Sequence, residues 1–164
     1  MRFVEGRDAA DIQQYASDPH IVQTCNVPHP YPENGGASFV TWANQSRSNG
    51  TGLVFAVLCD ATFAGLMTLN DIDLKARTAA LDYWIAVPFQ GQGIATVAAA
   101  EVIAYAFETL GIKTLHSGCL ARNPASARVL EKNGFVETGL LHHEGSADGR
   151  FAGETVRLFC RNAG

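Results

Sequence analysis

The segment from residue 78 to residue 120 constrains the fold more than any other part of the chain. Residues 91–110 carry apolar side chains on most sides of a predicted helix, and such a helix is buried against a sheet. β-Branched and aromatic residues at 78–87 and 113–120 predict a strand before and after it. A strand, a helix of this length and a second strand form a crossover unit, so we expect the two strands to run parallel.

The remaining segments extend this unit into one sheet with helices around it. Residues 18–36 contain four prolines and a Gly-Gly pair, which predict a loop. The whole chain, 1–164, is expected to form a single α+β (mixed α/β) domain with a central, mostly antiparallel sheet. The other expected elements are helices at 8–16, 37–48 and 124–132, and strands at 53–59, 63–69, 135–141 and 151–160.

Composition excludes several classes of protein. The apolar runs are shorter than a membrane helix and the N-terminus lacks a signal pattern, so we expect a soluble, cytoplasmic protein with no membrane partner. A net charge of −4 without a Lys/Arg cluster argues against nucleic-acid binding. The four cysteines form no CxxC pair, and the adjacent His142 and His143 would face opposite ways on a strand, so no metal site is predicted.

A glycine-rich turn precedes the long helix, at Gln90-Gly91-Gln92-Gly93-Ile94-Ala95-Thr96. Its backbone N–H groups and the positive end of the helix dipole favour an anion, above all a diphosphate. A tight strand-to-helix turn that needs glycine is the simpler interpretation. A dinucleotide fingerprint would place glycine at Thr96, and a P-loop would require a lysine, so neither common nucleotide motif is present.

Three stretches carry a family resemblance. Gln90-x-x-Gly93-x-Ala95 resembles the pyrophosphate-binding motif of GNAT acetyltransferases, and residues 82–88 resemble the fourth strand of that family. Asn123-x-x-Ser126 followed by residues 129–135 resembles its next signature. Pro28-His29-Pro30-Tyr31 is similar to an early-loop element of the RimJ/RimL-like branch.

The resemblance implies a GNAT fold in which the strands that end near Val87 and Leu120 splay apart to hold acetyl-CoA. It implies no metal. Backbone groups of residues 85–87 would pair with the pantetheine arm, and an N–H there would stabilise the oxyanion of a tetrahedral intermediate. The implied acetyl-CoA-binding residues are Ile85, Ala86, Val87, Gln90, Gly91, Gln92, Gly93, Ile94, Ala95, Thr96, Asn123 and Ser126.

Two catalytic residues are predicted. Many relatives use a tyrosine as the acid for the departing thiolate, but Leu130 occupies that position here, so Ser126 is the predicted substitute. A first-turn serine that stabilises its helix is the alternative, as is a plain N-cap for Asn123. Asp82 is the predicted base, with a salt-bridge or sheet-edge role as the alternative.

Weaker candidates for the base are His116, His29 and Tyr31, and the predicted substrate contacts are His29, Tyr31 and Trp84. The acceptor is expected between the 18–36 loop and the hairpin at 145–150.

The function expected from these residues is transfer of an acetyl group to a primary amine, on a protein N-terminus or a small molecule, by a monomer or homodimer. A non-catalytic acyl-CoA-binding or sensor module is the first alternative. A dehydrogenase or nucleotide-binding domain is the second.

Overall fold

The computed structural model describes residues 1–146 and 149–164, and its centre is a mixed sheet. Within these residues the sheet has seven strands in the order β1-β2-β3-β4-β5-β7-β6. Among the described strands only β4 and β5 pair in parallel, as the sequence predicts. The strands are β1 (Arg2–Phe3), β2 (Leu53–Cys59), β3 (Thr62–Asp73), β4 (Thr78–Ile85), β5 (Thr114–Leu120), β6 (Val136–His142) and β7 (Thr155–Asn162).

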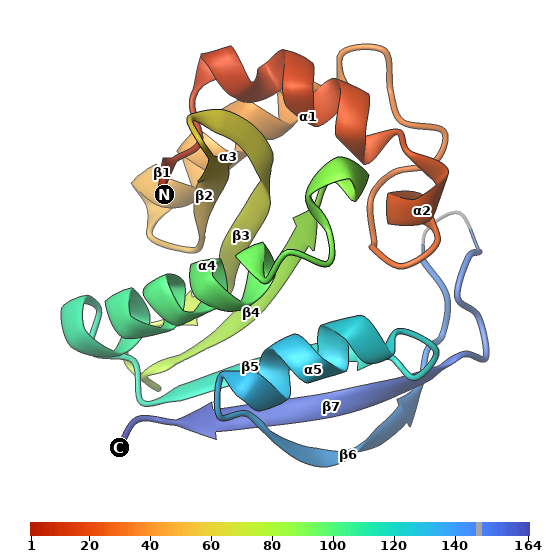
Figure 1. The fold of residues 1–164 in the computed structure, drawn as a ribbon. Coiled ribbons are helices and arrows are strands. Elements are labelled where there is room, and N and C mark those ends of the chain that lie inside the picture. Colours follow the sequence, from red (N-terminus) through yellow and green to blue (C-terminus); the bar gives the residue numbers. More distant parts are fainter. Residues whose placement is uncertain (147–148) are drawn as a thin grey trace.

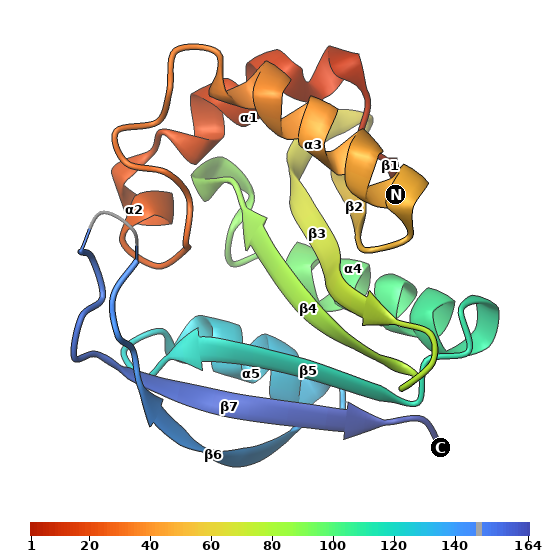
Figure 2. The ribbon, with the colours of Figure 1, turned by 180° about the vertical axis from the view of Figure 1, so that it is seen from behind.

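Helices cover both faces of the sheet. Figures 1 and 2, seen from opposite sides, place α1 and α3 over one face and α4 and α5 over the other. One apolar core fills the space under α4 and α5, and a second lies under α1 and α3. The helices are α1 (Ala9–Ala16), α2 (Pro19–Val22), α3 (Gly35–Asn49), α4 (Ile94–Ala104) and α5 (Pro124–Lys132).

The two parallel strands separate soon after they meet. In the described part of the chain, β4 and β5 pair only from Thr78 to Ala80 on one side and from Thr114 to His116 on the other. One residue further, the hydroxyl of Ser117 donates to the Leu81 carbonyl at 2.7 Å. Beyond this point the strands diverge, as Figure 2 shows, and the predicted splay of the central strands is confirmed.

Several predicted boundaries were wrong. α4 begins at Ile94 instead of residue 91, because Gly91 and Gly93 adopt left-handed φ values of 75° and 79° that end the preceding turn. It continues as one wider π turn over Tyr105–Thr109. β7 begins at Thr155 instead of residue 151, because the backbone turns at Phe151, where φ is +66°.

The segment 18–36, predicted as a loop because of its prolines, contains one short helix, α2. Pro19 occupies the first helical position of α2, where its missing N–H costs nothing. The Asp18 carboxylate caps this helix by accepting from the N–H of His20 at 2.8 Å. α2 and the turn that follows it lie beside the open end of β4 and β5 (Figure 2).

Candidate functional site

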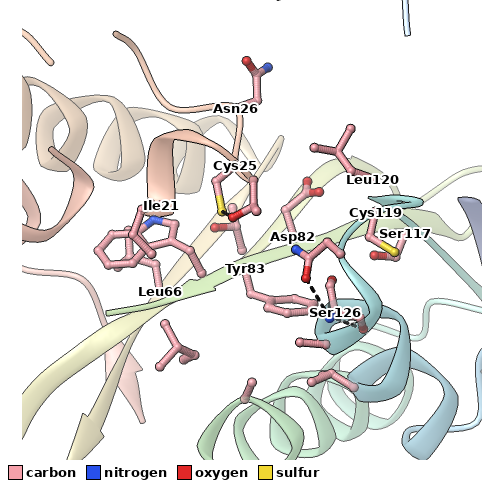
Figure 3. Close-up of a pocket in the computed structure, with 18 of the residues that line it drawn as sticks. Ile21, Cys25, Asn26, Leu66, Asp82, Tyr83, Ser117, Cys119, Leu120 and Ser126 are labelled. Atoms are coloured by element: carbon pink, nitrogen blue, oxygen red, sulfur yellow. Dashed lines mark hydrogen bonds between the residues drawn. The ribbon is translucent and has the colours of Figure 1, made fainter. Parts of the chain in front are cut away.

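A groove of about 840 Å³ runs through the splay between β4 and β5. Its walls are the outer parts of the two strands, the first turns of α4 and α5, and the residues that follow α2. Figure 3 shows side chains from β4, β5, α5 and the turn after α2 converging on this space. The groove is thus the cavity that the separation of the two strands creates.

The backbone of β4 presents hydrogen-bonding groups to the groove. The Ala86 N–H donates to the Ala64 carbonyl on β3 at 2.8 Å, so it is not free to bind a ligand, contrary to the expectation for residues 85–87. In an antiparallel ladder alternate residues turn away from the partner, which directs the backbone of Tyr83 and Ile85 towards the splay. The Ile85 carbonyl accepts from the Gln90 side-chain nitrogen, Nε2, at 2.8 Å. The Ile85 N–H points into the groove from the same side of the strand.

The start of α4 forms one end of the groove. The first intrahelical bond joins the Thr96 N–H to the Gly93 carbonyl at 3.0 Å, so the amides of Gly93, Ile94 and Ala95 precede the helical ladder. A Cβ at Gly91 or Gly93 would meet nothing within 4 Å, so glycine is required here for its left-handed backbone and leaves the turn uncrowded.

Two basic side chains from α5, Arg128 and Lys132, line the same region. The amides at the start of α4 together with these cations fit the phosphates of CoA.

The middle of the groove holds a hydroxyl pair. The Tyr83 hydroxyl on β4 lies 2.8 Å from the Ser126 Oγ and 3.0 Å from the Ser126 carbonyl on α5 (Figure 3). Burial raises the pKa of Tyr83 well above its ordinary value, so this phenol stays protonated and can donate. Ser126 is held in place in turn because its N–H donates to the Asn123 side chain at 3.3 Å, so Asn123 is an N-cap as well as a groove residue.

Leu130, which fills the usual tyrosine position, is fully buried in the core and does not reach the groove.

Asp82 lies at the other end of the groove. Its carboxylate accepts from the Asn70 side-chain amide at 2.7 Å, which fixes its orientation. Desolvation raises the pKa of Asp82, the hydrogen bond from Asn70 opposes this rise, and the nearby charge of Asp71 adds to it. Asp82 and Trp84 lie on the same face of β4, as the sequence predicts, and both line the groove. A carboxyl group with a raised pKa at this place is suited to accept a proton.

The wall opposite Asp82 comes from the turn after α2. Thr24 to Val27 line the groove, and burial raises the pKa of the Cys25 thiol. Two arginines from the C-terminal half fix this turn. Arg122 donates to the Gln23 carbonyl at 2.7 Å while also pairing with Glu154, and Arg150 donates to the carbonyls of Val22 and Val27.

Several predicted site residues lie elsewhere. His29 is exposed and lines no part of the groove, and His116 is likewise absent from its walls. Tyr31 instead lines a second, smaller cavity. The buried Ala86, together with Val87 and Gln92, does not line the groove either; the Gln92 side chain donates to the Pro88 carbonyl at 3.0 Å.

The expected acceptor hairpin at 145–150 includes residues 147–148, which lie outside the described residues. Its neighbours His143 and Phe151 line the groove.

Sequence reasoning missed several residues that line the groove. Tyr83 and Lys132 lie inside stretches that carry the family resemblance but received no role there, and Cys119 and Arg128 belong to predicted elements outside those stretches. Thr24 to Val27 belong to a segment predicted only as loop. The two basic residues of α5 could have been predicted from the sequence, because a helix adjacent to a proposed phosphate site is expected to carry cations.

The described residues hold no cluster of three or more His, Cys, Asp or Glu side chains able to bind a metal ion. None of the described helices is long and apolar enough to cross a membrane.

Comparison with known proteins agrees with this geometry. The chain belongs to the GNAT acetyltransferase family, since the family model for the acetyltransferase (GNAT) domain matches residues 1–136. It is 36% identical to the putative ribosomal N-acetyltransferase YdaF of Bacillus subtilis over 88 residues, 54% of this chain and 48% of that protein. Spermidine N(1)-acetyltransferase of Escherichia coli is 33% identical over 97 residues, 59% of this chain and 52% of the other. The matched part thus spans about half the length of these relatives.

Solved structures share the fold over nearly the whole chain. RimJ of Mycobacterium smegmatis, in complex with CoA-disulfide, is 26% identical with a TM-score of 0.87, covering 99% of this chain and 80% of that one. Spermidine N-acetyltransferase of Vibrio cholerae, in complex with CoA and spermine, is 23% identical with a TM-score of 0.84, covering 98% and 93%. The family uses acetyl-CoA as the acetyl donor, and the predicted GNAT fold is confirmed.

Proposed function

We propose that this chain transfers the acetyl group of acetyl-CoA to a primary amine by direct attack through a tetrahedral intermediate. The observation that carries the proposal is the content of one continuous groove: free helix amides at one end, a hydroxyl pair in the middle and a carboxylate at the other. The acceptor class includes protein N-termini and small-molecule amines, as in the ribosomal-protein and spermidine acetyltransferases that resemble the chain.

Each part of the groove has its own role in the proposed reaction. The first turn of α4, with Arg128 and Lys132, binds the phosphates of acetyl-CoA, and the β4 edge orients the pantetheine arm. Asp82 takes the proton that the amine must lose to attack the thioester carbon. The Ile85 N–H stabilises the oxyanion that forms on the carbonyl oxygen.

Collapse of the intermediate breaks the carbon–sulfur bond and releases CoA thiolate. The Ser126 hydroxyl donates a hydrogen bond to that sulfur, while the Tyr83 hydroxyl orients Ser126. Asp82 passes its first proton to water, and it then accepts the second proton, which the attacking nitrogen sheds as it becomes an amide. The chain's own residues thereby account for donor binding, deprotonation and departure of the leaving group.

The proposal is tested at Gly93 with two variants of equal backbone strain. Gly93→Glu places a carboxylate in the phosphate end of the groove, while Gly93→Ala carries the same left-handed backbone penalty without the charge. Acetyl-CoA at a hundred times its Kd stabilises the wild-type protein by about 2.7 kcal/mol in a thermal-shift assay. We expect this stabilisation to survive in Gly93→Ala and to vanish in Gly93→Glu; binding unaffected by the glutamate would refute the donor site.

Turnover distinguishes an enzyme from a binding module. Release of CoA thiol is measured over a panel of N-terminal peptides and small amines, with hydrolysis in the absence of amine as the control. Amine-dependent release supports the enzymatic proposal. Acetyl-CoA binding without release for any amine would favour the non-catalytic alternative.

A further inference from the structure

A second cavity opens beside the Asp82 end of the groove. It has a volume of about 220 Å³ and lies between the sheet, the start of the chain and the turn after α2. Its walls include Ile12 and Ala16 from α1 and Tyr31 from the early loop. Six residues line both the groove and this side cavity, so the two spaces are adjacent: Asn26, Val27, Phe39, Trp42, Leu66 and Trp84.

The side cavity is apolar and rich in aromatic rings. Phe39 and Trp42 on α3 lie with their ring centroids 5.4 Å apart, and Trp84 on β4 also lines the cavity. Trp42 keeps 45% of its surface exposed, which is a high fraction for a tryptophan. An apolar cavity of roughly 150 Å³ is large enough to hold benzene, so this one has room for an aromatic or branched aliphatic group. Such a group would cover the exposed face of Trp42.

The charge of this region matches one ammonium group. Among the described residues that line either cavity, Asp82 is the only carboxylate; Asp71 acts on it from outside the walls. A polyamine would bring two or more further charges into a lining that holds no second carboxylate among the described residues. Burying an unpaired charge costs more than the contacts return.

We propose that the acceptor is a monoamine whose nitrogen is joined by a short spacer to an aromatic or branched apolar group. This inference rests on the proposed acetyl transfer. The nitrogen lies at Asp82, and the apolar group occupies the side cavity beside Trp42 and Trp84. This arrangement places both ends of one small molecule on the acceptor side of the groove and leaves the rest of the groove to acetyl-CoA.

The test compares three amines: ethylamine is the reference, phenethylamine adds a ring to it, and spermidine adds charges. Phenethylamine carries one charge and a ring, ethylamine carries one charge without a ring, and spermidine carries several charges without a ring. We expect kcat/KM for phenethylamine to exceed that for ethylamine by roughly 10- to 100-fold, the effect of burying one phenyl group. Spermidine is expected to be the poorer substrate compared with phenethylamine. Equal values for the first two amines, or a preference for spermidine, would overturn the assignment.

A variant locates the preference in the side cavity. Trp42→Ala removes an aromatic wall at a half-exposed position, and Leu140→Ala removes a 63% exposed side chain on β6 that lines neither cavity. We expect the phenethylamine-to-ethylamine ratio to collapse in Trp42→Ala and to stay at the wild-type value in Leu140→Ala. A ratio unchanged by Trp42→Ala would overturn the role of the side cavity.

A binding measurement keeps this inference separate from the proposed reaction. Calorimetric titration of phenethylamine into the CoA-bound protein reports the side cavity even where no acetyl group moves. Binding that weakens at least tenfold in Trp42→Ala supports the inference, and if turnover is absent at the same time, only the proposed reaction fails. Turnover of other amines without phenethylamine binding would refute the inference and leave the reaction standing.

Discussion

Substitution of Ser126 by alanine is expected to lower the rate of acetyl transfer while leaving the stability of the fold nearly unchanged. The hydroxyl that is lost lies 2.8 Å from the Tyr83 hydroxyl, but the Ser126 carbonyl remains 3.0 Å from the same phenol. Tyr83 therefore keeps a hydrogen-bond acceptor, and no buried polar group is orphaned. The expected change in the free energy of unfolding is below about 1 kcal/mol, the net contribution of one such bond. The hydrogen bond to the departing sulfur is lost entirely.

We expect kcat to fall by roughly 10²-fold in Ser126→Ala, with little change in the Kd of acetyl-CoA. Stopped-flow detection of thiol release gives kcat, and calorimetry gives the Kd. Ser48→Ala is the matched control, because Ser48 also lies on a helix but outside the groove, at an exposed site where its hydroxyl donates to the Asn44 carbonyl. Normal turnover in Ser126→Ala would reduce Ser126 to a helix-stabilising residue and refute its role at the sulfur.

Two further substitutions test the base and the packing. Asp82→Asn keeps the shape of the side chain, but the amide cannot take a proton. Wild-type kcat/KM should fall as the pH drops through the Asp82 pKa, which is raised above its ordinary value of about 3.9. This fall should be missing from the pH profile of the Asp82→Asn variant. Gly36→Ala places a Cβ 2.1 Å from the Ala9 carbonyl and is expected to destabilise the fold by about 1–3 kcal/mol in urea denaturation. Gly6→Ala, whose Cβ meets nothing within 4 Å, should stay within about 0.5 kcal/mol, and equal effects would contradict the packing argument.

Local signals predicted the elements that position the donor end of the site. Asn123 followed by Pro124 predicts the start of α5, and the structure places the helix there with Asn123 as its cap. The apolar character of residues 91–110 predicts a buried helix, and α4 packs in the core as expected. Such features depend on residues close together in the chain, which is why one sequence suffices to find them.

Contacts between residues far apart in the chain could not be predicted from the sequence. Tyr83 and Ser126 are 43 residues apart, and on its strand Tyr83 resembles any aromatic β residue. The position of Asp82 beside Asn70 depends on the register of β3 against β4, which no local pattern specifies. His29 and Tyr31 were assigned to the acceptor from a motif alone; His29 lines neither cavity, while Tyr31 lies in the wall of the side cavity.

The arginines that hydrogen-bond to the turn after α2 have a practical consequence for protein engineering. Arg122 and Arg150 come from the far half of the polypeptide, yet they hold the carbonyls of Val22, Gln23 and Val27. A chimera that places this early segment on a relative's scaffold would lose these hydrogen bonds unless the relative also supplies cations at the positions of Arg122 and Arg150. The early segment and the part of the chain that carries the two arginines would therefore have to be transplanted together.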